Sequence, residues 1–191
     1  MSTLISKNHS GWMVKAPQLA LILITIIWGG SFITVQYGLN FSSPMMFVGL
    51  RFAAAALAVT LISLKSLKGM NLKEVFAGTV IGFMIAIGYG TQTVGLQTIS
   101  SSESAFLTAL YVPLVPILLW LLFRKKPQMM TWIGALFAFI GLVFLTGNGF
   151  AAIQLSFGQT LTLLGSIAIA LEIIFISHFA ERVNVRRVTV L

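Results

Sequence analysis

Long apolar runs, separated by short polar stretches, make up most of this chain. Six of these runs approach or exceed the ~20 residues that a helix needs to cross a membrane. The pattern predicts an all-α fold, a polytopic membrane bundle of six transmembrane helices. We expect them at residues 17–37, 44–64, 74–96, 102–123, 129–148 and 157–180.

Composition agrees with this pattern. The 191 residues are 58% hydrophobic and 8% charged, whereas a soluble domain carries about 25% charged residues. A soluble fold of this size cannot bury so much apolar surface. The net charge of +8 would suggest nucleic acid in a soluble protein. Here the basic residues lie in short runs between apolar segments, so we expect contact with membrane lipid and no nucleic acid partner.

The basic residues also predict how the chain is oriented. The connections near 38–43, 97–101 and 149–156 contain no Lys or Arg, and eleven of the twelve basic residues lie in the tail and loops on the other side. By the positive-inside rule that side is cytoplasmic, and so are both ends of the chain. These residues are Lys7, Lys15, Lys65, Lys68, Lys73, Arg124, Lys125, Lys126, Arg182, Arg186 and Arg187.

Hydroxyl and amide side chains concentrate between Tyr89 and Pro116, where two expected helices meet. In the second of them, Ser104, Thr108 and Tyr111 share one face. Tyr89 and Gln92 lie in the first. We expect a polar cavity between these helices. The alternative is that the same residues only join the helices through hydrogen bonds.

Two prolines interrupt the expected fourth helix. Pro113 and Pro116 each remove a backbone hydrogen bond, which predicts a kink.

Three charged residues lie in or near the expected spans. Arg51 is the basic residue inside a span, and it is either a ligand for an anionic group or a structural partner. Glu103 begins the fourth helix, where a helix cap is the expected role, and it would approach Arg51 if helices 2 and 4 were neighbours. Glu172 has apolar neighbours, which suits either proton coupling or a tolerated neutral side chain.

Small residues recur every four positions in the expected third helix, at Gly78, Gly82, Ala86 and Gly90. Such a face lets helix backbones approach closely in lipid, so we interpret it as a packing surface.

Known patterns of enzyme chemistry do not occur in the sequence. There is no HExxH, GxSxG or phosphate loop, and no cysteine for a thiolate site or disulfide. We therefore expect no enzyme activity, no cofactor and no metal.

Several short motifs, in this order, resemble those of the EamA-type members of the drug/metabolite transporter superfamily. The resemblance covers roughly residues 19–148. It is carried by Trp28-Gly29-Gly30-Ser31-Phe32, by Pro44 with Arg51-Phe52, by Ala105-Phe106-Leu107-Thr108 leading to Pro113, and by Gly134 with Gly141. The family often has an acidic residue after the fourth helix, where this chain has Arg124-Lys125-Lys126.

The resemblance implies ten helices in two inverted five-helix repeats, with a substrate cavity between the halves. It divides the chain into a cytoplasmic tail (1–16), a first repeat (17–148) and the start of a second repeat (149–191), apparently truncated after the sixth helix. The candidate substrate-binding or cavity-lining residues are Trp28, Ser31, Arg51, Tyr89, Gln92, Ser104, Thr108 and Tyr111, with Glu172 for proton coupling.

The implied function is transport of small metabolites or amino-acid-like solutes, commonly export, by alternating access across a bacterial inner membrane. The expected partners are lipid, a small-molecule substrate, and a second copy or a complementary C-terminal half. The alternative is a non-transporting membrane subunit or a defective remnant of a transporter.

Overall fold

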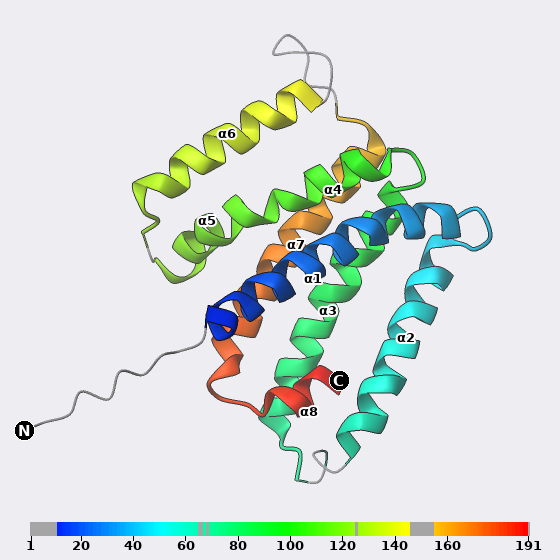
Figure 1. The fold of residues 1–191 in the computed structure, drawn as a ribbon, viewed down its shortest axis with the longest axis vertical. Coiled ribbons are helices and arrows are strands. Elements are labelled where there is room, and N and C mark those ends of the chain that lie inside the picture. Colours follow the sequence, from blue (N-terminus) through cyan, green and yellow to red (C-terminus); the bar gives the residue numbers. More distant parts are fainter. Residues whose placement is uncertain (1–10, 65–66, 68, 125, 146–154, 191) are drawn as a thin grey trace, which may run out of the picture.

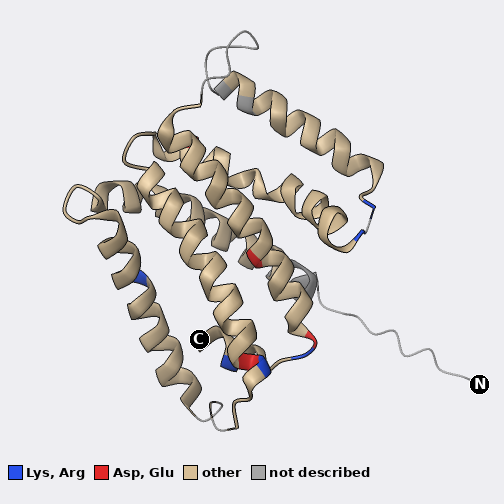
Figure 2. Cartoon of the chain, turned by 180° about the vertical axis from the view of Figure 1, so that it is seen from behind, with Lys and Arg blue, Asp and Glu red and all other residues tan. Residues whose placement is uncertain are grey.

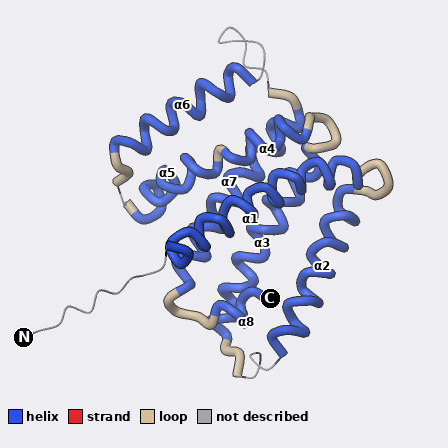
Figure 3. Tube along the Cα trace, viewed as in Figure 1, coloured by secondary structure: helices blue, strands red, loops and turns tan. Residues whose placement is uncertain are grey.

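The described chain is helical throughout, with short connections (Figures 1 and 3). The computed structural model describes residues 11–64, 67, 69–124, 126–145 and 155–190. In this part of the chain the helices are α1 (Gly11–Gly38), α2 (Pro44–Ser63), α3 (Leu72–Gly95), α4 (Ser101–Ala109), α5 (Tyr111–Phe123), α6 (Met129–Leu145), α7 (Phe157–Ala180) and α8 (Val185–Val190).

Five stretches are long and apolar enough to cross a membrane: Pro17–Gly38, α2, α3, Ser101–Phe123 and α7. The polytopic bundle is therefore confirmed. The count of six spans is met only in part, because the apolar stretch of α6, Met129–Gly141, is shorter. The expected end of that span at 146–148 lies outside the described residues, as do residues 1–10 of the tail, residues 149–154, and Lys65, Lys68 and Lys125.

The predicted interruption of the fourth span is confirmed. Ser101–Phe123 is one stretch by composition, but it forms two helices that meet at Leu110. Pro113 cannot donate a hydrogen bond to the carbonyl of Ala109, where α4 ends. The break therefore falls one turn before the first proline.

The pair α3 and α7 is the most extensively packed in the bundle, and α7 is the most buried span. The two helices meet through glycines in antiparallel register. A Cβ atom on Gly165 would lie 2.8 Å from the carbonyl oxygen of Gly88, and one on Gly95 would lie 2.8 Å from that of Gly158. Because glycine carries only a hydrogen atom in place of a side chain, the two helix backbones can approach each other this closely.

Aromatic contacts near the C-terminal end of α7 show which loops lie together. Near one end, Phe179 contacts Phe76 at the start of α3, and His178 stacks on Phe123 at the end of α5. Three basic residues are close in sequence to these aromatic residues: Lys73, Arg124 and Arg182. We therefore call this end of the bundle the basic end. Figure 2 shows the charged residues gathered chiefly where helices end. This grouping agrees with the predicted alternation of loops, although which side is cytoplasmic stays a prediction.

Candidate functional site

Tyr89 on α3 brings several of the predicted residues together. The guanidinium carbon of Arg51 lies 5.6 Å from the centroid of the Tyr89 ring and 5.8 Å from that of Phe52. The two rings meet edge to face at 5.4 Å. A cation over an aromatic face gains about 0.5–1 kcal/mol at an exposed site and more when water is excluded. Arg51 is therefore held by aromatic faces.

Glu172 on α7 lies within electrostatic reach of the same tyrosine, as do Arg51 and Tyr111. Its Oε2 atom is buried and has no hydrogen-bond partner among the described residues. Carboxyl groups inside a membrane are costly and mostly face a partner or a water-filled cavity. Tyr89 thus lies under the Arg51 guanidinium of α2 and within electrostatic range of the Glu172 carboxyl of α7.

Trp28 and Tyr111 form a second contact between predicted residues. Their ring centroids lie 5.9 Å apart, which brings α1 against the start of α5. Ser31 belongs to the same part of α1, but its hydroxyl donates to the carbonyl of Trp28 at 2.6 Å. Its hydrogen is therefore used within its own helix.

The polar residues between α3 and α4 are packed against each other. The amide nitrogen of Gln92 donates to the hydroxyl of Thr108 at 2.7 Å, and both side chains are buried. Ser104 is fully buried, and its hydroxyl has no partner in the described part of the chain. The Gln92–Thr108 contact agrees with the alternative to a polar cavity, in which these residues only join the helices through hydrogen bonds.

Arg51 and Glu103, which were expected to approach each other only if helices 2 and 4 were neighbours, form no ion pair in the described part of the chain. Glu103 accepts a hydrogen bond from the side-chain nitrogen of Gln159, and Arg51 lies over Tyr89. The reason is the order of packing: α2 contacts α3 and α8, whereas α4 contacts α7 and α1. Ser100 caps α4, because its hydroxyl accepts a hydrogen bond from the backbone nitrogen of Glu103, and Glu103 lies in the first turn as expected.

Two residues that the sequence reasoning passed over join distant segments. Gln36 donates to the carbonyl of Ile99 and accepts from the backbone nitrogen of Ser101, both at 3.1 Å. Gln159 is the N3 residue of a capping box that begins at the N-cap residue Ser156. A Ser-x-x-Gln pattern is visible in sequence as a helix start, but nothing there shows that the same glutamine also reaches α4.

A groove runs between α2, α3, α7 and α8, with a volume of about 660 Å³. None of the nine predicted site residues lines it. Gly78, Gly82 and Ala86, which we expected to pack against another helix, form one of its walls instead. The close helix contact of α3 is made by Gly88 and Gly95.

Residues 16–147, more than half of the chain, match the model of the EamA-like transporter family. The chain belongs to this family. The family assignment made from the motifs is therefore confirmed, and the protein is a multi-pass membrane protein of a transporter family.

Its relatives include an uncharacterized transporter of Archaeoglobus fulgidus, 35% identical over 167 residues, which are 87% of this chain and 50% of the relative. The uncharacterized inner membrane transporter YedA of Escherichia coli K12 is 30% identical over 78% of this chain and 49% of its own length. The uncharacterized transporter YvbV of Bacillus subtilis is 24% identical over 87% of this chain and 55% of its own length. The chain thus spans about half the length of these relatives. No solved structure gives a significant match.

Proposed function

We propose that this chain forms one half of a carrier that exports small metabolites or amino-acid-like solutes by alternating access. The observation that carries the proposal is the arrangement around Tyr89, where the Arg51 guanidinium lies over the ring and the Glu172 carboxyl lies within electrostatic range. Intramembrane ionisable groups mark substrate and ion paths more often than packing surfaces. In this proposal Arg51 binds the anionic group of the solute.

Glu172 has the coupling role. Its Oε2 atom accepts no hydrogen bond from the described residues, so a proton can bind and leave without breaking an internal contact. Trp28, Ser31, Gln92, Ser104, Thr108 and Tyr111 form the wall on the α1, α3 and α4–α5 side. The fully buried hydroxyl of Ser104 supports this, because an unsatisfied polar group at membrane depth needs a ligand or water.

The proposal also places the protein in a bacterial inner membrane, with the basic end facing the cytoplasm. The alternation of basic loops and the inner-membrane location of the YedA relative support this placement.

Counterflow in proteoliposomes tests the function. The chain is reconstituted alone, and also together with the C-terminal half of a full-length relative, and exchange of labelled amino acids is measured one at a time. We expect exchange in the paired sample. In that sample Arg51→Gln and Tyr111→Phe should lower the rate at least tenfold, whereas Arg186→Gln, a charge change away from Tyr89, should leave it unchanged.

Two outcomes decide against parts of this proposal. If Arg51→Gln and Tyr111→Phe both exchange the solute at the wild-type rate, the site assignment is wrong. If Glu172→Gln still responds to an imposed proton gradient as the wild type does, Glu172 has no coupling role. Absence of exchange in both samples favours the alternative, a membrane subunit that does not transport.

A further inference from the structure

A second pocket lies at the basic end of the bundle, between the start of α3 and the end of α7, with a volume of about 420 Å³. Sites for small ligands in proteins commonly have about 300–1,000 Å³. Both helices are candidate membrane spans, so the pocket lies where two spans end. Two cationic and four apolar side chains line it: Leu72, Lys73, Phe76, Phe179, Arg182 and Val183.

The two cations of this pocket lack a counter-charge among the described residues. The ion pair found there joins Glu74 to Arg187, and neither Lys73 nor Arg182 takes part in it. Glu181 precedes Arg182 in sequence but does not line the pocket. Like charges that share one pocket repel each other, and an anion between them replaces this repulsion with attraction. The charge pattern therefore suits an anionic group.

An aromatic residue lies about one helical turn further into the span than each cation. Phe76 follows Lys73 by three residues on α3, about 4.5 Å along the helix. On the other wall, the backbone nitrogen of Arg182 donates to the carbonyl of Phe179 at 2.8 Å. The two rings meet edge to face with their centroids 6.2 Å apart, and Phe76 is 63% exposed. The pocket thus has an open apolar floor between the two cations.

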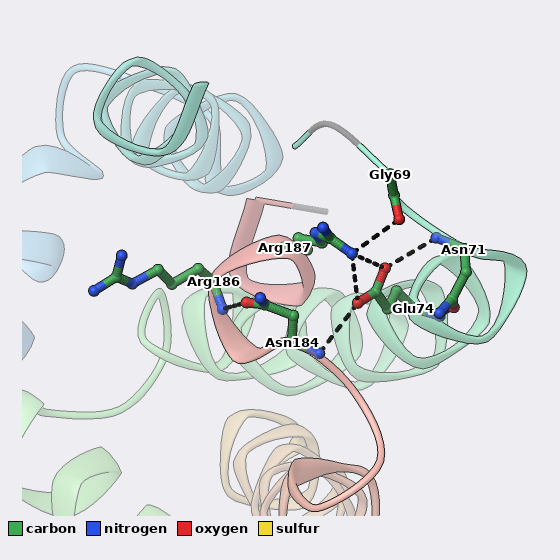
Figure 4. A network of polar contacts seen from close by, with 6 residues as sticks. All are labelled: Gly69, Asn71, Glu74, Asn184, Arg186 and Arg187. Carbon is green, nitrogen blue, oxygen red and sulfur yellow. Dashed lines mark hydrogen bonds and ion pairs between the residues drawn. The ribbon is translucent and has the colours of Figure 1, made fainter. Parts of the chain in front are cut away.

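The carboxylate of Glu74 holds the two walls of the pocket together (Figure 4). Glu74 follows Lys73 in sequence, and its Oε1 atom accepts a hydrogen bond from the backbone nitrogen of Asn184 at 3.2 Å. Asn184 follows Arg182 by two residues, so this bond joins the loop after α7 to the start of α3. Arg187 Nη1 lies 3.2 Å from both carboxylate oxygens. The charge of Glu74 is therefore balanced within this network and leaves the pocket cationic.

We propose that this pocket binds an anionic phospholipid, with the phosphate between Lys73 and Arg182 and an acyl chain along Phe76. Basic pockets between transmembrane helices bind the head groups of anionic lipids. A free phosphate would use the two cations alone, whereas a lipid also covers the exposed aromatic floor. The positive-inside rule accounts for basic residues in these loops, but not for two of them converging over a pair of aromatic rings. The site does not depend on the proposed transport function.

Native mass spectrometry of the purified chain in a mild detergent tests the site. The probe is dioleoylphosphatidylglycerol, and dioleoylphosphatidylcholine is the lipid without net charge. We expect the wild type to retain at least fivefold more of the anionic lipid. Lys73→Gln/Arg182→Gln should lower the fraction that binds phosphatidylglycerol at least fivefold. The matched control Lys126→Gln/Arg186→Gln removes the same net charge outside the pocket and should stay within twofold of the wild type.

Further variants separate a lipid site from general attraction and from misfolding. Lys73→Arg/Arg182→Lys keeps both charges and should bind phosphatidylglycerol as the wild type does. Circular dichroism reports the helix content of every variant. If Lys73→Gln/Arg182→Gln loses its helical signal, the two single variants decide, and each should lower binding at least twofold.

Three results would overturn the proposal. The first is wild-type binding in Lys73→Gln/Arg182→Gln, or in both single variants where these decide. The second is an equal loss in the matched control, which would mean that net charge alone attracts the lipid. The third is displacement of the lipid by excess inorganic phosphate together with unchanged binding in Phe76→Ala, which would assign the pocket to a free anion.

Discussion

The glycine contacts between α3 and α7 yield a quantitative prediction for Gly165→Ala. A Cβ atom at this position would lie 2.8 Å from the carbonyl oxygen of Gly88 and 2.8 Å from the hydroxyl of Thr91. Ordinary contact begins at 3.4 Å, so the helices must separate by about 0.6 Å. The carbonyl oxygen of Gly88 belongs to the backbone, so no side-chain rotation can relieve the contact. Overpacking of this kind costs about 1–3 kcal/mol.

The substitution also has a favourable part, which a control must remove. Alanine in a helix interior is about 1 kcal/mol better than glycine, as measured in water. Gly134 in α6 is the matched control, because a Cβ atom there would have nothing within 4 Å. Both substitutions gain the stability that alanine gives to a helix, but only Gly165→Ala has the cost of the close contact. The difference between the two variants should therefore be about 1–3 kcal/mol.

Unfolding in mixed micelles, titrated with a denaturing detergent and followed by circular dichroism, measures this difference. We expect Gly165→Ala to unfold at a lower detergent fraction than Gly134→Ala. Equal midpoints would refute the reasoning, because they would mean that α3 and α7 do not pack through Gly88 and Gly165 in the membrane-like state.

Two other substitutions remove specific hydrogen bonds, and the same titration measures their effect. Gln36→Ala removes both contacts between α1 and the α3–α4 turn, which should lower the free energy of unfolding by about 1–3 kcal/mol; a change below 0.3 kcal/mol would count against this connection. Thr108→Val keeps the shape but leaves the buried Gln92 amide without its acceptor, at a similar cost of about 1–3 kcal/mol. Adding Gln92→Leu should recover much of that loss, and no recovery would contradict the contact.

The positions of the spans were predictable because hydrophobic length is a local property. Each of the five apolar spans starts and ends within a few residues of the expected bounds, and the break at Leu110 follows from proline chemistry. The grouping of loops was predictable for a similar reason, since alternating basic loops reflect how the chain crosses the membrane.

Side-chain contacts between different helices were not predictable, because they depend on which helices pack against each other. The repeat of Gly78, Gly82 and Ala86 shows a smooth face but not what lies against it, and the structure places a groove there. Arg51 was expected either to bind an anionic group or to be a structural partner, and the packing of α2 on α3 places it over the ring of Tyr89, beside Phe52 of its own helix. Glu74 was not singled out, since an Asn-x-x-Glu pattern before an apolar run indicates a helix start and nothing more.

Polar side chains tie both ends of the α3–α7 pair to neighbouring helices. At each end, the N3 residue of a capping box also reaches across to another helix: Glu74 contacts Arg187 of α8, and Gln159 contacts Glu103 of α4. The glycine pairs between these ends leave no room for α3 and α7 to slide past each other. Any change of shape is therefore concentrated in the elements that polar side chains hold.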